Sequence, residues 1–432
     1  PRIVAQFHEW MTGTGVLYLK KYAPWIATAF TTHATVLGRS IAGNNRPLYS
    51  RMEDYNPQQI AREFNIIAKQ SLEKITAAEA DVFTAVSAIT GRECLTFLGK
   101  EPDFITPNGF EDSFVPCSDD FDTCRKDARA SLMKVASALL GYQLPQDTIL
   151  VSTSGRYEFR NKGIDLFIDA MGKLNKKTGN KTKCVAFILV PAYHKGPRPE
   201  LQAALGENPV PLTGDRFLTH GLHYPSTDPV LNRISANGID NSEKSAVKII
   251  FVPSYLQGDD GIFNKTYYDL LIGFDITMYP SYYEPWGYTP LESLMFRVPT
   301  VTTTLSGFGM WVNTYFKEPG DGCLVVKRND ENEAEVVEAM SGFVDRFLKL
   351  DYPSIKAARE KAWEISRIAN WSTLFHYYTD AYSSAFMKSE ERRRQPREYA
   401  RLLETTEVIV RKPHQIPVWK DIYVQSDLPE TL

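Results

Sequence analysis

Cysteine is scarce in this 432-residue chain, which has five cysteines and no Cys-x-x-Cys pair. They are odd in number and scattered along the sequence, at Cys94, Cys117, Cys124, Cys184 and Cys323. This usage predicts neither a disulfide framework nor a cysteine-rich zinc site. It favours a reducing compartment, and we therefore expect a cytoplasmic protein.

A charge excess and a long apolar run are also missing. Lys and Arg total 49 and Asp and Glu total 52, for a formal net charge of −3. This balance argues against a nucleic-acid partner bound through overall positive charge. The longest apolar runs fall far short of the roughly 20 residues that a membrane-spanning helix needs, so we expect no membrane partner.

What is present is an alternation of short apolar runs with longer helical patterns. We predict buried strands within residues 2–7, 26–32, 81–87, 103–109, 148–156, 184–192, 248–254, 275–281, 299–304 and 323–328. Helical spacing of apolar residues occupies 57–80, 123–141, 163–175, 265–273 and 331–350. This order is typical of parallel α/β sheets, in which ligands bind beyond the carboxyl ends of the strands.

The length and the 43% hydrophobic content allow two or three domains with cores of their own. We place the main boundary near residue 145, where "GYQLPQDT" interrupts the pattern. The expected units are 1–145, 146–375 and a C-terminal helix and tail at 376–432, with packing of the last unit on the first left open. Residues 195–243 are rich in Pro, Gly and Asn and predict an irregular insertion.

The stretch Tyr279–Gly309 combines two glutamates with an aromatic loop and a glycine-rich end. We predict a helix start in which Thr289 is the N-cap, Pro290 is the first residue and Glu292 completes a capping box. That explains Glu292 structurally, but it leaves Glu284, which precedes the helix, without a structural task. The free amides of such a helix start favour a phosphate ligand.

A second cluster is "GRYEFRNKG", Gly155 to Gly163, directly after a predicted strand at 148–153. Arg156 and Lys162 could both face one ligand from this loop, and two cations beside a strand end suit a diphosphate. A charged turn with solvated cations explains the same residues, and the pattern alone leaves both interpretations open.

Two histidines, His8 and His33, each follow an apolar strand, and Arg39 lies shortly after the second one. A single histidine is more often structural than catalytic, and two at strand ends favour a site only modestly. The "TGTG" at 12–15 lacks the third glycine of a dinucleotide fingerprint. Asn108 in "TPNG" suits an ordinary turn.

Together these motifs resemble the eukaryotic-type glycogen synthase family, which are retaining glucosyltransferases of the GT-B fold. The matching blocks are "FHEW", "FTTHATVLGR", "TPNG", "GRYEFRNKG" and "YPSYYEPWGYTPLES" followed by "VPTVTTTLSGFG", and they span Phe7 to Gly309 in the family's order. The resemblance implies two Rossmann-like domains that face each other across a cleft. Nothing here matches the family's early Lys-Thr-Gly-Gly-like loop, so it also implies that the first domain is incomplete.

The resemblance assigns roles residue by residue. Arg156 and Lys162 would hold the diphosphate of UDP, and Glu284 would contact the donor glucose and support charge at its anomeric carbon. Glu292 would bind the ribose. His33 is expected among the catalytic groups, near the donor sugar.

The remaining family positions follow in the same way. Arg39 and Asn108 would lie on the donor side of the cleft, and His8 and Glu9 on its acceptor side. Expected donor contacts come from the backbone near Trp286, Gly287, Tyr288 and Thr289, and expected uridine neighbours are Tyr255, Tyr267 and Tyr288.

The implied activity is transfer of glucose from UDP-glucose to the non-reducing end of an α-1,4-glucan, without a metal or other cofactor, by a homo-oligomer. Alternatives are a GT-B transferase with another donor or a small acceptor, and a non-catalytic glucan-binding scaffold. A phosphorylase is less favoured, since no lysine motif for pyridoxal phosphate stands out. Residues 350–374 carry only Arg359 and Arg367, where regulated members have a dense arginine helix for glucose 6-phosphate.

Overall fold

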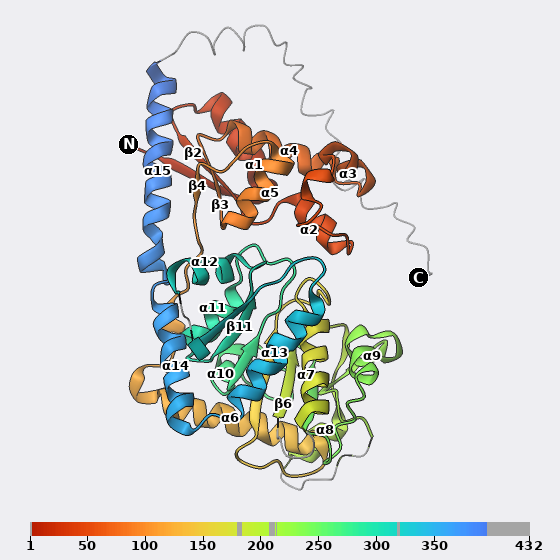
Figure 1. The fold of residues 1–432 in the computed structure, drawn as a ribbon. Helices are drawn as coiled ribbons and strands as arrows, with labels where there is room; N and C mark the ends of the chain where they lie inside the picture. Colours follow the sequence, from red (N-terminus) through yellow and green to blue (C-terminus); the bar gives the residue numbers. More distant parts are fainter. Residues whose placement is uncertain (1, 179–183, 207–211, 213, 318–319, 395–432) are drawn as a thin grey trace.

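The computed structural model describes residues 2–178, 184–206, 212, 214–317 and 320–394 of the chain. They form two α/β units stacked one above the other, each built around a parallel sheet (Figure 1). The predicted fold class, two Rossmann-like domains with parallel sheets, is therefore confirmed.

The first sheet has the order β1-β2-β3-β4, and all its neighbours are parallel. Its strands are β1 (Val4–His8), β2 (Ala27–Thr32), β3 (Val82–Ala85) and β4 (Phe104–Ile105). Its helices are α1 (Glu9–Tyr22), α2 (Val36–Gly43), α3 (Pro57–Glu63), α4 (Ile67–Glu79) and α5 (Ala88–Leu98). The helical pattern at 57–80 divides into α3 and α4 because Asn65 adopts a positive φ of 56° between them.

The second sheet has the order β12-β11-β10-β5-β6-β9 and is also parallel. Its strands are β5 (Ile149–Ser154), β6 (Cys184–Leu189), β9 (Val247–Val252), β10 (Ile276–Met278), β11 (Thr300–Thr303) and β12 (Cys323–Val326). Helices of this unit are α6 (Ser118–Leu140), α7 (Ile164–Thr178), α10 (Tyr267–Leu271), α11 (Tyr288–Met295), α12 (Gly307–Tyr315), α13 (Glu333–Phe347) and α14 (Tyr352–Arg367).

The region 195–243, predicted as an irregular insertion, contains regular structure. An antiparallel pair, β7 (His194–Pro197) and β8 (His220–Leu222), is accompanied by the short helices α8 (Pro199–Leu205) and α9 (Pro229–Ala236). The prediction was wrong because prolines here open helices, where a missing N–H costs nothing, instead of interrupting them.

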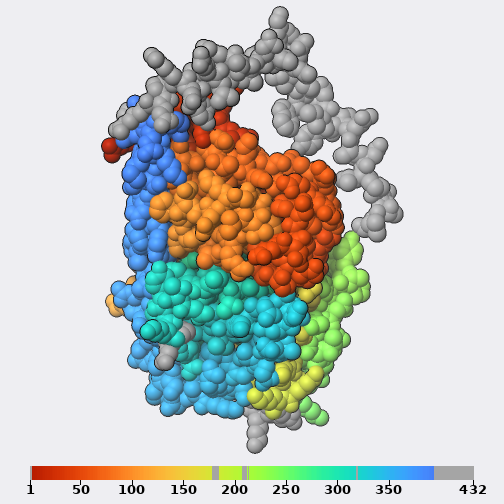
Figure 2. Space-filling model, turned by 45° about the horizontal axis from the view of Figure 1, so that its top comes forward, coloured from red at the N-terminus to blue at the C-terminus, as the bar shows by residue number. Residues whose placement is uncertain are grey.

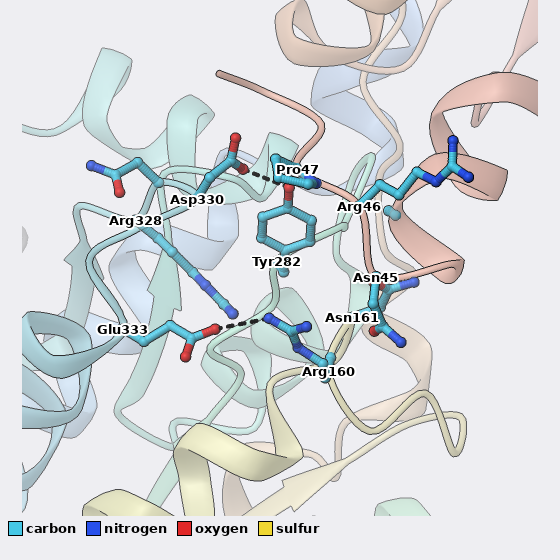
Figure 3. Close-up of a pocket in the computed structure, with 11 residues that line it drawn as sticks. Asn45, Arg46, Pro47, Arg160, Asn161, Tyr282, Arg328, Asp330 and Glu333 are labelled. Carbon is cyan, nitrogen blue, oxygen red and sulfur yellow. Dashed lines mark hydrogen bonds and ion pairs between the residues drawn. The ribbon is translucent and has the colours of Figure 1, made fainter. Parts of the chain in front are cut away.

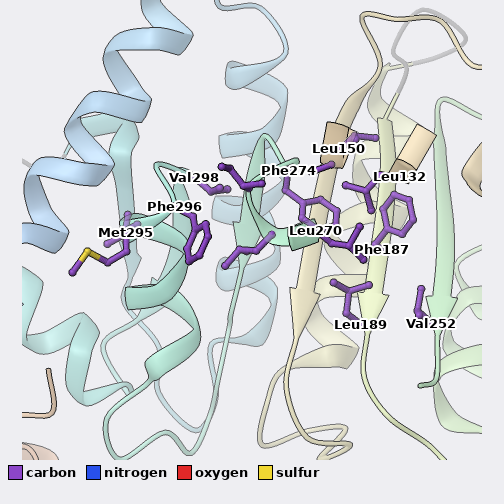
Figure 4. Packing of buried hydrophobic residues seen from close by; sticks show 14 of the residues in the cluster. Leu132, Leu150, Phe187, Leu189, Val252, Leu270, Phe274, Met295, Phe296 and Val298 are labelled. Carbon is purple, nitrogen blue, oxygen red and sulfur yellow. The ribbon is translucent and has the colours of Figure 1, made fainter. Parts of the chain in front are cut away.

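The largest core lies between the second sheet and the helices that include α6, α10, α11 and α12. Figure 4 shows Phe187 and Phe274 side by side in this core, and their ring centroids lie 5.6 Å apart in an edge-to-face contact. Because Leu132 of α6 belongs to the same cluster, α6 packs with the second unit although it precedes β5 in the chain.

The last described helix, α15 (Trp371–Arg394), returns to the first sheet. It begins beside the second unit and runs along the side of the first (Figures 1 and 2), and its Ala381 and Ala385 form a small core with Ala27 of β2 and Val82 of β3. Where the chain re-enters the first unit, Trp371 N donates to the Phe110 carbonyl at 3.2 Å. The chain thus passes between the units twice, near Phe110 and near Trp371, and these two segments are hydrogen bonded to each other.

Candidate active site

The loop between β5 and α7 places one predicted cation beside the aromatic loop. Gly155 and Gly163, at its two ends, have φ values of 141° and 69°, which favour glycine. A Cβ on Gly163 would also overlap the carbonyl oxygen of Pro280, which follows β10. Glycine therefore lets this loop pack directly against the backbone that follows β10. Lys162 is thereby placed beside the loop that begins after Pro280.

Lys162 and Glu284 form the central contact of the site. The Lys162 Nζ lies 2.5 Å from Glu284 Oε2, and their side chains are only 16% and 14% exposed. The Glu284 backbone is held as well, since Gly307 N donates to its carbonyl at 3.0 Å. A cation and a carboxylate are thus fixed together at the carboxyl end of the second sheet, where parallel sheets bind ligands.

Arg156, the other cation of this loop, does not join that pair. It is exposed, and its guanidinium lies 2.8 Å from the carboxylate of Glu158. Arg156 instead lines a pocket of about 570 Å³ in the second unit, together with Tyr255, Tyr267 and Thr289. Four predicted donor residues therefore surround one cavity.

The pocket's two tyrosines differ in exposure. Tyr267 is partly buried, and its hydroxyl forms a hydrogen bond of 2.8 Å with Ser154 Oγ, so its ring is held in one orientation. Tyr255 is 69% exposed and forms an outer wall of the pocket.

The predicted capping box at the start of α11 is wrong. The helix begins at Tyr288 with Gly287 as its N-cap, at a φ of 107°, and no side chain caps it. Glycine allows the chain to enter the helix earlier than a threonine cap would, so Thr289 and Pro290 already belong to the first turn. The amides of Tyr288 and Thr289 lie where an α-helix leaves N–H groups without intrahelical partners.

Glu292 consequently needs another explanation. Its Oε1 accepts a hydrogen bond of 3.0 Å from the Tyr268 hydroxyl, and burial raises its pKa to about 7. A buried carboxyl with one hydroxyl partner and no capping task is more suggestive of a ligand contact than the sequence pattern was.

Trp286 and Tyr288, both predicted near the donor, differ in exposure, since the first is buried and the second is exposed to solvent. The Trp286 ring is 4% exposed and packs edge-to-face on Phe308 with centroids 5.8 Å apart, so only its backbone is available to a ligand. Tyr288 is 42% exposed.

On the first unit, His8 and His33 lie together. His8 Nδ1 and His33 Nε2 are 2.9 Å apart, and Glu9 Oε1 accepts the backbone amides of His33 and Ala34, each at 3.1 Å. Burial, assisted by the charges of His8 and Arg39, lowers the pKa of His33 to about 4. His33 is therefore neutral at physiological pH.

Arg39 and Asn108 occupy separate places. Arg39 is exposed on α2 and lines a pocket of about 500 Å³ between the units, whose other wall is the loop 157–161. Asn108 is 3% exposed, and its Oδ1 accepts a hydrogen bond of 3.2 Å from Tyr378 of α15. The structure thus gives Asn108 a tether to α15.

A smaller polar cavity of about 60 Å³ marks the seam between the units (Figure 3). Asn45, Arg46 and Pro47 approach it from the first unit, and Arg160, Tyr282, Arg328, Asp330 and Glu333 approach it from the second. Across this seam the Tyr282 hydroxyl accepts Leu48 N at 2.7 Å and donates to Asp330 at 2.5 Å.

Sequence reasoning missed the groups that support the predicted residues. These are Tyr268 beside Glu292, the buried carboxyls Glu73 and Glu93, and the paired Tyr282 and Tyr283. Tyr282 and Tyr283 stood inside the quoted motif but received no task. The glutamates could have been found as acidic residues on the apolar faces of helical patterns.

Among the residues that the structure describes, no group of three or more His, Cys, Asp or Glu side chains is arranged to hold a metal ion. No helix in those ranges is long and apolar enough to cross a membrane.

Comparison with known sequences identifies relatives along almost the whole chain. The glycogen synthase family model matches residues 1–197 and 213–426. Glycogen [starch] synthase of Neurospora crassa is 28% identical over 446 residues, covering 90% of this chain and 63% of the relative. The Rattus norvegicus liver enzyme is 28% identical over 434 residues, covering 88% and 62%. This chain thus spans less than two thirds of the length of these relatives.

Solved structures agree on the fold. The catalytic domain of starch synthase IV from Arabidopsis thaliana, bound to ADP and acarbose, superposes with a TM-score of 0.55 at 15% identity, covering 89% of this chain and 73% of that one. Sucrose-phosphate synthase from Thermosynechococcus elongatus gives 0.53 at 16% identity, covering 89% and 74%. These likenesses confirm the predicted GT-B fold.

Proposed function

The chain belongs to the glycogen synthase family, and we propose that the full-length protein transfers glucose from UDP-glucose to the non-reducing end of an α-1,4-glucan with retention of configuration. The observation that carries this proposal is the partly buried Lys162–Glu284 pair, fixed beside the start of α11 at the carboxyl end of the second sheet.

The donor's diphosphate lies against the cations and amides of this region. When the bond between the anomeric carbon and the phosphate oxygen breaks, the leaving UDP takes the electron pair and gains negative charge. Lys162, Arg156 and the free amides of Tyr288 and Thr289 offset that charge, so the proposal needs no metal. Lys162 can turn from Glu284 to the phosphate through its flexible side chain.

Glu284 serves the sugar end of the donor. The glucose becomes oxocarbenium-like as UDP leaves, and a nearby carboxylate stabilises that positive charge. The acceptor hydroxyl attacks from the face that UDP leaves, and its proton passes to the departing phosphate. Glu284 and Glu292 have different partners, Lys162 and Tyr268, which fits two contacts on one donor better than the paired acid and nucleophile of a glycosidase.

The nucleoside end occupies the pocket of about 570 Å³. Tyr267 and Tyr255 offer ring surface to the uracil. Glu292 of α11, whose carboxylate accepts the Tyr268 hydroxyl of α10, meets the ribose. Neutral His33 faces the donor sugar from the first unit, with Arg39 beside the phosphates and His8 and Glu9 toward the acceptor.

The test is incorporation of labelled glucose into glycogen by the full-length gene product, with UDP-glucose and ADP-glucose compared. We expect incorporation from UDP-glucose and near-complete loss in Glu284→Ala with the fold intact by circular dichroism. In calorimetry, Arg156→Ala should bind UDP more weakly than the wild type. Absence of incorporation from either donor refutes the proposal and favours a glucan-binding scaffold or another substrate.

Two further parts of the proposal concern the setting. We place the reaction in the cytoplasm, which the five free cysteines support. We also expect a homo-oligomer, which light scattering after size-exclusion chromatography tests directly.

A further inference from the structure

We propose that Glu93 is a positioning residue that joins the two halves of the site when the units are closed on each other. This inference rests on the proposed function for its kinetic part. Glu93 touches no reacting group itself and acts through Thr35 and Tyr283.

One carboxylate oxygen makes both connections. Glu93 lies on α5 of the first unit and is 1% exposed. Its Oε2 accepts a hydrogen bond of 2.6 Å from Thr35 Oγ and another of 3.0 Å from the Tyr283 hydroxyl of the second unit. Thr35 comes two residues after His33, and Tyr283 directly precedes Glu284. The contact therefore spans the seam between the two candidate reaction faces.

In the first unit, Gly38 leaves the space that the Glu93 carboxylate occupies. A Cβ on Gly38 would overlap Glu93 Oε2, although Gly38 has ordinary helical backbone, so the glycine supplies space and not conformational freedom. Thr35 is at the same time the N-cap of α2, because its Oγ accepts Gly38 N at 3.0 Å. The carboxylate thus fixes the start of α2, with His33 just before the helix and Arg39 on it.

The cost of burying Glu93 explains why the second unit matters. Burial raises the pKa of Glu93 to about 7, and within the described part of the chain the hydroxyls of Thr35 and Tyr283 are the hydrogen-bond donors to its carboxylate. A buried charge is costly unless it is well hydrogen bonded. Separation of the units would remove the Tyr283 hydroxyl and leave Thr35 alone, so the contact favours the closed arrangement.

The Tyr283 ring also stabilises the closed arrangement of the two units. It is 3% exposed and belongs to a cluster of first-unit residues that includes Leu37, Ile41 and Phe97. The aromatic ring provides nonspecific apolar contact, whereas the hydroxyl donates to Glu93 and so fixes one position of the second unit against the first. Replacement of Tyr283 by phenylalanine removes only the second contribution.

The donor pocket predicts how the kinetics respond. All residues that line the pocket of about 570 Å³ come from the second unit. UDP binding therefore does not need the Glu93 contact, whereas turnover needs His33 and Glu284 in register. Loss of the contact should lower kcat while the affinity for UDP stays the same.

The experiment compares Tyr283→Phe and Glu93→Gln in the full-length protein with two matched controls. Tyr142→Phe removes a tyrosine hydroxyl bond of 3.0 Å to the Asn241 carbonyl, away from the seam. Asp81→Asn alters a buried carboxyl that accepts Thr28 N at 2.8 Å within the first unit, at the amino ends of β2 and β3 and away from the seam. Fluorophores introduced as unnatural amino acids at exposed Lys74 and Lys244 report the distance between the units.

We expect both test variants to lose about tenfold or more in kcat, with the Kd for UDP within about twofold of wild type. The distribution of distances between the labels should broaden in both, but in neither control. Tyr283→Phe removes the donor of this contact, and Glu93→Gln replaces its charged acceptor by a weaker, neutral amide oxygen. Because both substitutions act on the same contact, the double variant should be no worse than the poorer single one.

Retention of wild-type kcat and label distances by Tyr283→Phe and Glu93→Gln would overturn the proposal, and so would equal losses in the controls. If the wild type transfers no glucose, the proposed function fails, while the label distances still decide whether Glu93 joins the units. If Glu93→Gln does not fold, Tyr283→Phe, which keeps the buried ring, provides the decision.

Discussion

Substitution of Lys162 by methionine separates the structural and chemical contributions of the central ion pair. The Glu284 side chain is 14% exposed, and the variant leaves its carboxylate with Ser281 Oγ, at 3.4 Å, as a side-chain partner. At 2.5 Å the attraction in an effective dielectric of about 20 is about 7 kcal/mol before desolvation is subtracted. Desolvation cancels much of this, so we expect a net loss of about 2 kcal/mol in the free energy of unfolding.

Glu284→Gln and the double variant complete a thermodynamic cycle. Each single variant leaves one partner without its counter-charge, whereas Lys162→Met with Glu284→Gln leaves neither. The double variant should therefore be less destabilised than the sum of the two single variants, with a coupling energy of about 1–3 kcal/mol. Urea unfolding followed by tryptophan fluorescence measures this, with Lys173→Met and Glu338→Gln as an exposed ion pair for comparison.

Activity should not follow stability through this cycle. If both groups act on the donor, the double variant regains stability but remains inactive in the glucose-incorporation assay. Additive unfolding energies, within about 0.5 kcal/mol, would refute the energetic coupling. Recovery of activity in the double variant would refute the assignment of both groups to the reaction and make the pair purely structural.

Two other substitutions test the site by different means. Since burial raises the pKa of Glu292 to about 7, the folded state keeps a proton that the unfolded state releases near pH 4.5, and stability falls as pH rises between these values. Glu292→Gln should therefore gain up to about 3 kcal/mol relative to wild type between pH 4.5 and pH 8 in urea unfolding, and a pH-independent difference would contradict this. Gly163→Ala forces a Cβ onto the Pro280 carbonyl at a positive φ, so we expect about 2–4 kcal/mol of destabilisation and weaker UDP binding by calorimetry. Gly342→Ala, where a Cβ meets open space, is the control. Wild-type UDP affinity in Gly163→Ala would count against the role given to the loop geometry.

Much of the fold could be predicted because buried parallel strands appear in the sequence as short apolar runs. Each predicted strand region overlaps an observed strand, and the strand ends at His8 and Thr32 put both histidines at the carboxyl end of the first sheet. Glu284 could be singled out for the same local reason, since a loop carboxylate after a strand had no capping task.

The remaining features depend on contacts between distant residues. The start of α11 was misplaced because Gly287 begins this helix without a side-chain cap. A Cβ at Gly287 would come too close to Ser306 Oγ, a contact that the local pattern does not reveal. The role of Glu93 depends on Tyr283, 190 positions away, which no local pattern reports. Likewise, α6 and α15 show ordinary helical spacing, and nothing in that spacing specifies which sheet each one covers.

The path of α15 has a consequence for biosynthesis. Ala27 and Val82, on the face of the first sheet, are covered by Ala381 and Ala385 near the end of the described chain. During translation the first unit emerges first, but its sheet face stays uncovered until the ribosome has made the second unit and α15. The unit synthesised first is therefore the one completed last, and a nascent chain that stalls before residue 371 would expose an apolar surface to chaperones.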